Sequence, residues 1–170
     1  MIVKIDRNYL EINSLKDLNY TKKPNNHCNL ILVDPPDFQL NKFFYKQIGK
    51  DYRWFDRLIW DDNKWINYVN NSKVKTYVLK DKENLIGYFE MIFDDITKSC
   101  EIAYFGILKE YIGKKYGSYL LSEVINTSFI NGNNRVWLHT CSLDHKNALG
   151  NYLARGMKIF KSETINLDIN

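Results

Sequence analysis

The chain has 170 residues, of which 15% are aromatic, and a formal net charge of +4. This length predicts one domain over residues 1–170, and because nothing in it resembles a signal peptide or a membrane-spanning helix, we expect a soluble, cytoplasmic protein that does not act at a membrane. The three cysteines, Cys28, Cys100 and Cys141, are odd in number and far apart, which argues against a disulfide framework or a zinc motif, so we expect no metal.

The first half of the chain predicts two strands, then two helices, then three more strands. The early strands are Ile2–Ile12 and Cys28–Val33, the second of which is stopped by two prolines. The helices are Leu40–Gly49 and Asp62–Asn71. Two polar turns then divide a meander whose strands are Lys75–Leu79, Leu85–Phe93 and Cys100–Leu108.

Aromatic residues are concentrated between Phe43 and Tyr68. Aromatic rings can stack on nucleobases, but this segment also carries four aspartates, Asp51 and Asp56 among them, which would repel a phosphate backbone. We therefore expect no nucleic-acid partner. We expect instead that the rings form the apolar faces of two helices and close the core.

The meander is followed by a turn, Tyr111–Ser118, that leads directly into a helix. The first N–H groups of a helix have no internal partner, so such a turn can bind phosphate. Gly113 and Gly117 permit a close approach of the backbone, while Lys114 and Lys115 add positive charge. A turn of this composition can equally be a simple connection between a strand and a helix.

The last third of the chain alternates helix and strand. The helix that begins at the turn runs to Phe129, and a strand follows over Arg135–Cys141. Asp144 is predicted to cap a helix over His145–Arg155, and the last predicted strand is Met157–Glu163. Composition and periodicity alone indicate a mixed α/β protein.

The turn and its helix resemble the acyl-CoA pyrophosphate loop of the GNAT acetyltransferase superfamily, usually written R/Q-x-x-G-x-G/A. Ile112 stands where Arg or Gln is usual and Lys115 where the first Gly is usual, while Gly117 fits the last position. The common form of the loop, Y-R-G-K-G-I-G-S-x-L-L, is matched by Tyr111, Gly113, Lys114, Gly117, Ser118, Leu120 and Leu121. Without the Arg, a phosphate contact must come from elsewhere, such as Lys114 or Lys115, and Lys115 needs a backbone conformation that glycine adopts more easily.

A second GNAT motif, N-x-x-A-x-x-x-Y-x-x-x-G-F, is matched in spacing by Ala148, Tyr152 and Gly156, with His145 replacing the Asn. The stretches 52–57, 87–90, 101–106 and 139–145 are also similar to a subgroup of bacterial GNAT proteins described only as predicted acetyltransferases. The resemblance covers most of the chain. It implies the GNAT fold, an α/β domain of the α+β type with a mixed, mostly antiparallel sheet flanked by helices, but it identifies no substrate.

The resemblance implies an N-acetyltransferase that transfers acetyl from acetyl-CoA, or a related acyl group, directly to a primary amine without a metal. It places the general base at Glu101, because some histone-type relatives carry their catalytic glutamate at this distance before the loop. Tyr152 occupies the position of the tyrosine that protonates the leaving thiolate. The alternatives are that Glu101 pairs with a lysine on the neighbouring strand and that Tyr152 is a core residue with a satisfied hydroxyl.

The resemblance also implies where the two substrates bind. Residues implied to bind acyl-CoA are Phe105, Gly106, Ile107, Leu108, Gly113, Lys114, Lys115, Tyr116, Gly117, Ser118, His145 and Asn147. Residues implied to contact the acceptor, with Glu90 also a reserve base, are Trp54, Phe55, Asp56, Glu90 and His139. The acceptor itself is a small molecule or a protein amine, and the resemblance admits a homodimer, because many relatives dimerise.

Two other interpretations are open. The altered phosphate loop would suit a domain that binds acyl-CoA as a sensor and does not catalyse. A domain that has lost CoA binding would instead contact a protein partner through its aromatic helices, which requires the aromatic side chains to form an exposed patch.

Overall fold

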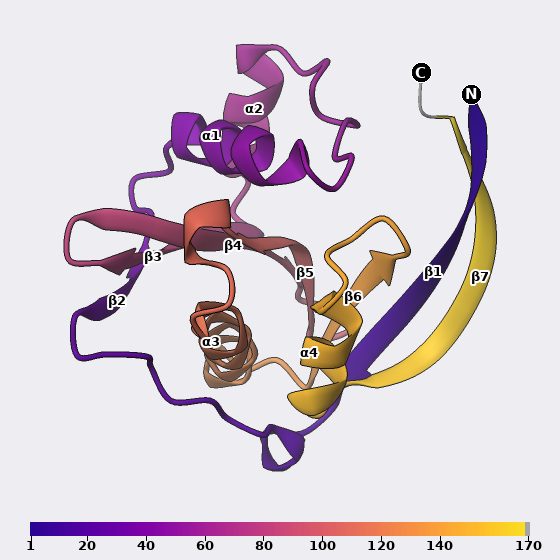
Figure 1. The fold of residues 1–170 in the computed structure, drawn as a ribbon. Coiled ribbons are helices and arrows are strands. Elements are labelled where there is room, and N and C mark those ends of the chain that lie inside the picture. Colours follow the sequence, from indigo (N-terminus) through magenta and orange to yellow (C-terminus); the bar gives the residue numbers. More distant parts are fainter. Residues whose placement is uncertain (169–170) are drawn as a thin grey trace.

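The computed structural model describes residues 1–168, which form one mixed sheet with α-helices on both faces (Figure 1). The strands are β1 (Ile2–Ile12), β2 (Cys28–Leu32), β3 (Val74–Asp81), β4 (Asn84–Asp94), β5 (Ser99–Ile107), β6 (Arg135–Cys141) and β7 (Lys158–Asp168). The helices are α1 (Phe38–Gly49), α2 (Asp62–Val69), α3 (Tyr116–Ile130) and α4 (Ala148–Ala154), with 3-10 turns η1 (Leu15–Asp17) and η2 (Lys109–Tyr111). The strand order is β2-β3-β4-β5-β6-β1-β7. This arrangement confirms the predicted fold class.

Strands β5 and β6 are the parallel neighbours of the sheet, and they separate early. They pair over three positions, from Ser99 with Arg135 to Glu101 with Trp137. β5 also carries a β-bulge, because Glu90 of β4 pairs with Tyr104 and Met91 with Ile102, which leaves one extra residue between them. A bulge bends its strand. The sheet therefore opens between β5 and β6 just beyond Glu101.

The N-terminal strand β1 lies between β6 and the edge strand β7. It is antiparallel to both, with Arg7 paired to Cys141 of β6 and Ile2 paired to Asp168 of β7. In Figure 1 β1 and β7 run together as a long curved pair. Leu10 is 0% exposed and belongs to the main apolar core, so β1 is an integral part of the domain.

Two apolar clusters fix the helices to the two faces of the sheet. On one face α3 buries residues such as Leu120 and Val124 in the main core. On the other face Phe44 of α1 stacks on Tyr88 of β4, with ring centroids 4.8 Å apart. Phe44 and Tyr45 are each 0% exposed and Trp65 is 1% exposed. These three rings lie in the core as expected, whereas Phe43 is 40% exposed.

Several predicted boundaries differ from the structure. The last helix begins at Ala148, and Asp144 is not its cap, because its carboxylate accepts hydrogen bonds from Thr140 Oγ1 at 2.5 Å and from the Cys141 N–H at 2.9 Å. β7 continues beyond Glu163 because β1 pairs with it along its length. Over residues 1–168, none of the helices has both the length and the apolar composition to cross a membrane.

Candidate active site

A cavity of about 700 Å³ lies at the opening between β5 and β6. Its walls come from the segment after α1, from β5, from the turn before α3, from β6 and the loop after it, from α4 and from β1. The volume is in the range of small-molecule sites. Glu101, the last residue of β5 that pairs with β6, lines this cavity.

Most of the predicted site residues line this one cavity, although they come from distant segments. They are Glu101 and Tyr152; Phe105, Gly106, Ile107, Gly113, Lys115, Gly117, Ser118, His145 and Asn147; and Trp54, Phe55, Asp56 and His139. Leu108, Lys114, Tyr116 and Glu90 do not line it.

Two of those four residues, Lys114 and Tyr116, belong to the turn, and Leu108 precedes it. The Tyr116 hydroxyl donates to Asp81 Oδ2 at 2.6 Å, so its side chain points into the protein and only its backbone is available to a ligand. Lys114 is exposed, with Nζ 5.7 Å from the centre of the Tyr111 ring. Leu108 packs against the cluster under α1.

The side chain of Glu101 is half-buried. No lysine of residues 1–168 forms an ion pair with it, so the alternative pairing with a neighbouring strand is absent. Burial raises the pKa of Glu101, and the positive charge of Arg57 opposes this rise. A carboxyl group with a raised pKa is suited to accept a proton near neutral pH.

Tyr152 lies on α4 and its side chain is 8% exposed. Its ring contacts that of Phe105 on β5, with centroids 6.4 Å apart, and both residues line the cavity. Burial raises the pKa of the Tyr152 phenol. The hydroxyl therefore stays protonated at neutral pH, which a proton donor requires.

The turn before α3 has the geometry of an anion-binding loop. Gly113 and Lys115 have φ angles of +81° and +68°, which confirms that Lys115 adopts the left-handed conformation that glycine adopts more easily. In residues 1–168 the N–H groups of Gly117 and Ser118 have no hydrogen-bond acceptor of ordinary geometry, and both residues line the cavity. These N–H groups and the Lys115 side chain fit the phosphates of an acyl-CoA.

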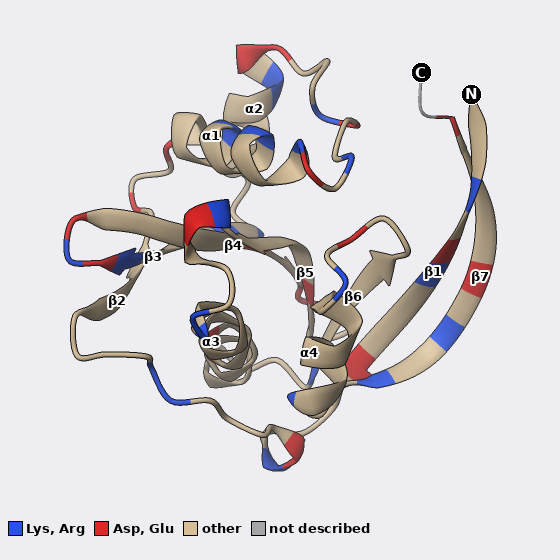
Figure 2. Cartoon of the chain, viewed as in Figure 1, with Lys and Arg blue, Asp and Glu red and all other residues tan. Residues whose placement is uncertain are grey.

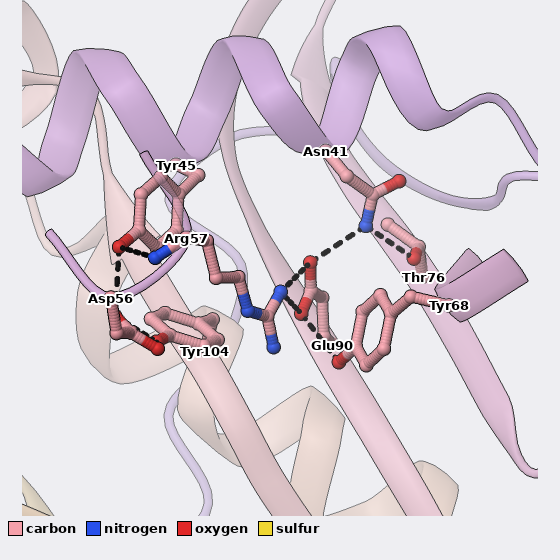
Figure 3. A network of polar contacts seen from close by, with 8 residues as sticks. All are labelled: Asn41, Tyr45, Asp56, Arg57, Tyr68, Thr76, Glu90 and Tyr104. Atoms are coloured by element: carbon pink, nitrogen blue, oxygen red, sulfur yellow. Dashed lines mark hydrogen bonds and ion pairs between the residues drawn. The ribbon is translucent and has the colours of Figure 1, made fainter. Parts of the chain in front are cut away.

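The sequence did not predict a buried ion pair on the α1–α2 side of the sheet (Figure 3). Arg57 Nη1 lies 2.9 Å from Glu90 Oε2, and the two side chains are 6% and 0% exposed. Glu90 also accepts hydrogen bonds from Asn41 Nδ2 and the Tyr68 hydroxyl, each at 2.8 Å. The geometry therefore does not support the predicted role of Glu90 as a substrate contact or reserve base and assigns it a structural role.

Aromatic rings surround the Arg57 guanidinium and orient the neighbouring Asp56. The guanidinium carbon lies 4.1 Å from the centre of the Tyr104 ring and 4.2 Å from that of Tyr68. Asp56 Oδ1 accepts hydrogen bonds from the Tyr45 hydroxyl at 2.8 Å and the Tyr104 hydroxyl at 2.9 Å. Asp56 still lines the cavity, so two tyrosines hold a carboxylate at its wall.

Charge is dispersed over the rest of the molecule. Figure 2 shows Lys and Arg distributed over helices, strands and loops, interspersed with acidic residues. In the described part of the chain, no group of three or more His, Cys, Asp or Glu side chains is placed to hold a metal ion.

The sequence matches the model of the acetyltransferase (GNAT) family over residues 38–157. This is more than half of the chain, and the chain belongs to that family. A search of curated proteins found no match.

Solved structures share the fold at low sequence identity. A GCN5-related N-acetyltransferase from Sphaerobacter thermophilus is 15% identical with a TM-score of 0.72, and the match covers 95% of this chain and 50% of that one. A functionally unknown conserved protein from Staphylococcus epidermidis is 19% identical with a TM-score of 0.61, over 100% of this chain and 63% of that one. An aminoglycoside acetyltransferase from an uncultured soil metagenomic sample is 12% identical with a TM-score of 0.65, and the match covers 78% of this chain and 90% of that one. The chain thus spans about half to two thirds of the first two proteins.

Proposed function

We propose that this domain transfers an acyl group, acetyl in the simplest case, from an acyl-CoA to a primary amine by direct attack. The observation that carries the proposal is that one cavity is lined by the Glu101 carboxyl with its raised pKa, by the buried Tyr152 phenol and by the N-terminus of α3. These are the base, the acid and the anion site that such a transfer requires.

Each of these groups has a distinct part in the reaction. An acyl-CoA supplies the thioester carbonyl. Lys115 and the N–H groups of Gly117 and Ser118 bind its phosphates. Glu101 accepts a proton from the attacking amine, directly or through water, and Tyr152 supplies a proton to the departing sulfur.

The edge of β5 provides further contacts. Beyond Glu101 this strand is not paired with β6, so backbone N–H and C=O groups on that edge have no strand partner. Phe105, Gly106 and Ile107 lie in this part of β5 and line the cavity. We expect their backbone groups to bind an extended chain such as the pantetheine arm.

Calorimetric titration with acetyl-CoA, with ATP and desulfo-CoA as controls, tests the anion site. We expect acetyl-CoA to bind and Lys115→Glu to weaken it by roughly 10-fold or more, because the substitution removes a charge-assisted contact and adds repulsion. Lys22→Glu makes the same charge change in an exposed loop residue outside the cavity lining and serves as the matched control.

Thiol release from acetyl-CoA in the presence of a panel of primary amines then tests transfer. Release that depends on an amine supports the proposed reaction. Acetyl-CoA binding without any release would identify a non-catalytic acyl-CoA binder, and an absence of binding at millimolar acetyl-CoA would contradict the proposal altogether.

A further inference from the structure

Arg7 on β1 lies in the wall of the cavity, and its guanidinium forms no ion pair within residues 1–168. Its Nε is buried and has no hydrogen-bond partner in the described part of the chain. The carboxylate opposite it in the β1·β7 register, Glu163, accepts a hydrogen bond from the Tyr9 hydroxyl at 2.8 Å and pairs with Lys161 at 3.3 Å. A half-buried guanidinium group with unused donors calls for an anionic partner.

The other cations of the cavity wall are placed differently. Arg57 is already compensated by Glu90. Lys115 lies at the turn before α3, where the phosphates are expected. Arg53 is exposed, so water weakens any contact it makes with an anion. Arg7 is therefore the cation best placed to bind an anion away from the phosphate end.

Arg7 and Glu101 lie at a separation that suits a small molecule with two charged ends. Arg7 pairs with Cys141 of β6, and Glu101 pairs with Trp137 of the same strand. The two positions are therefore four residues apart along β6. This corresponds to about 13 Å along β6, with a further sideways offset because β1 and β5 lie on opposite edges of it. Long side chains that reach from both positions leave room for a compact ligand.

We propose that the acceptor carries a carboxylate as well as its amine, as in an amino acid, and that Arg7 binds the carboxylate. This inference rests on the proposed acyl transfer and names the substrate class. Glu101 faces the amine, Arg7 holds the other end, and the apolar Trp54 and Phe55 contact the remainder. Arg7 lies outside residues 38–157, so the part of the chain that matches the family model does not include this specificity residue.

Paired acceptors test the proposal in acetyl transfer. The pairs are phenylalanine with 2-phenylethylamine, leucine with 3-methylbutylamine, and lysine with 1,5-diaminopentane, which differ only in the carboxylate. For at least one pair we expect the wild-type kcat/KM to favour the carboxylated member by roughly 10- to 100-fold, the effect of a charge-assisted hydrogen bond. Arg7→Gln should abolish this preference, and Arg7→Lys should retain part of it because the charge remains without the planar fork.

A binding measurement makes the test independent of turnover. Calorimetric titration with 3-phenylpropanoate, with and without CoA, should give a dissociation constant at least about 10-fold higher for Arg7→Gln than for the wild type. Lys4→Gln removes a positive charge from an exposed residue of the same strand, and Arg53→Gln removes one from the exposed part of the cavity wall. Both controls should bind the probe as the wild type does.

The outcomes distinguish this inference from the proposed function. If Arg7→Gln equals the wild type in acceptor preference or in probe binding, or if Arg53→Gln has the larger effect, the assignment of Arg7 is wrong. If the wild type fails to bind acetyl-CoA, the acyl-transfer proposal fails, while the probe titration without CoA still decides whether Arg7 binds carboxylates.

Discussion

At the level of single residues, Glu101 carries a conflict between stability and chemistry. Its folded-state pKa is raised by burial, so the fold favours the protonated carboxyl over the ionised one. The stability that this group contributes is present below its unfolded pKa of about 4.3 and is lost as the pH rises through the folded pKa. Near neutral pH the ionised form therefore destabilises the fold, although it is the form that accepts a proton.

Replacing Glu101 with Gln should consequently slow the reaction and stabilise the protein. We expect kcat/KM at pH 7 to fall by about 10²- to 10⁴-fold, and the rise of kcat/KM with pH that ionisation of Glu101 produces to disappear. The melting temperature should increase at pH 8 and change less at pH 4. Glu83→Gln, in the exposed β3–β4 turn, should change neither rate nor melting temperature, and equal behaviour of the two variants would contradict the role of Glu101.

Glu90 should behave in the opposite way, because its carboxylate is buried in a network with Arg57. Removing one partner of a buried ion pair leaves an uncompensated charge, so we expect Glu90→Gln to lower the free energy of unfolding by roughly 3–5 kcal/mol in denaturant titrations. Asp62→Asn breaks the exposed pair between Lys42 and Asp62 and should cost at most about 1 kcal/mol. A cost for Glu90→Gln as small as that for Asp62→Asn would show that the pair is not structurally important.

At the level of elements, the sequence predicted those features that depend on residues close together in the chain. The strand with Glu101, the turn with its strained Lys115 and the apolar face of α3 all follow from residues close in sequence. The failed cap at Asp144 shows the limit of this reasoning, because a carboxylate before a helix can also bond backwards, as it does to the end of β6. The pair between Arg57 and Glu90 gave no local signal, because it depends on how a loop packs on a distant strand.

The strand β1 offers an element-level test of the core. Leu10 is 0% exposed within the main cluster, whereas Ile2 on the same strand is 71% exposed. Leu10→Ala should lower the free energy of unfolding by about 2–5 kcal/mol, because it removes apolar contacts and leaves a cavity. Ile2→Ala should change it by about 0.5 kcal/mol or less. Similar small costs for both substitutions, measured by urea unfolding, would mean that β1 is only loosely attached.

At the level of the whole molecule, two imperfect motifs in the right order predicted the fold. Most of the candidate site residues that were named from these motifs line one cavity in the structure. The position of β1 could not be predicted in the same way. Its alternating pattern indicates a strand but not its neighbours, because pairing with β6 and β7 joins opposite ends of the sequence. Arg7 was missed for this reason, since only that pairing brings it to the cavity wall.

The same pairing has a consequence for how the chain acquires its shape during synthesis. Among the strands of this sheet β1 leaves the ribosome before the others, and β6 and β7, which hydrogen-bond to its two edges, leave after the others. The β3–β4–β5 meander needs only short turns and can form while translation continues. Until β6 and β7 emerge, β1 keeps two unpaired edges, which is the state in which a strand is open to wrong partners. A nascent chain can thus contain a formed meander before the cavity wall with Arg7 exists. The complete cavity forms only when β1 pairs with β6 and β7.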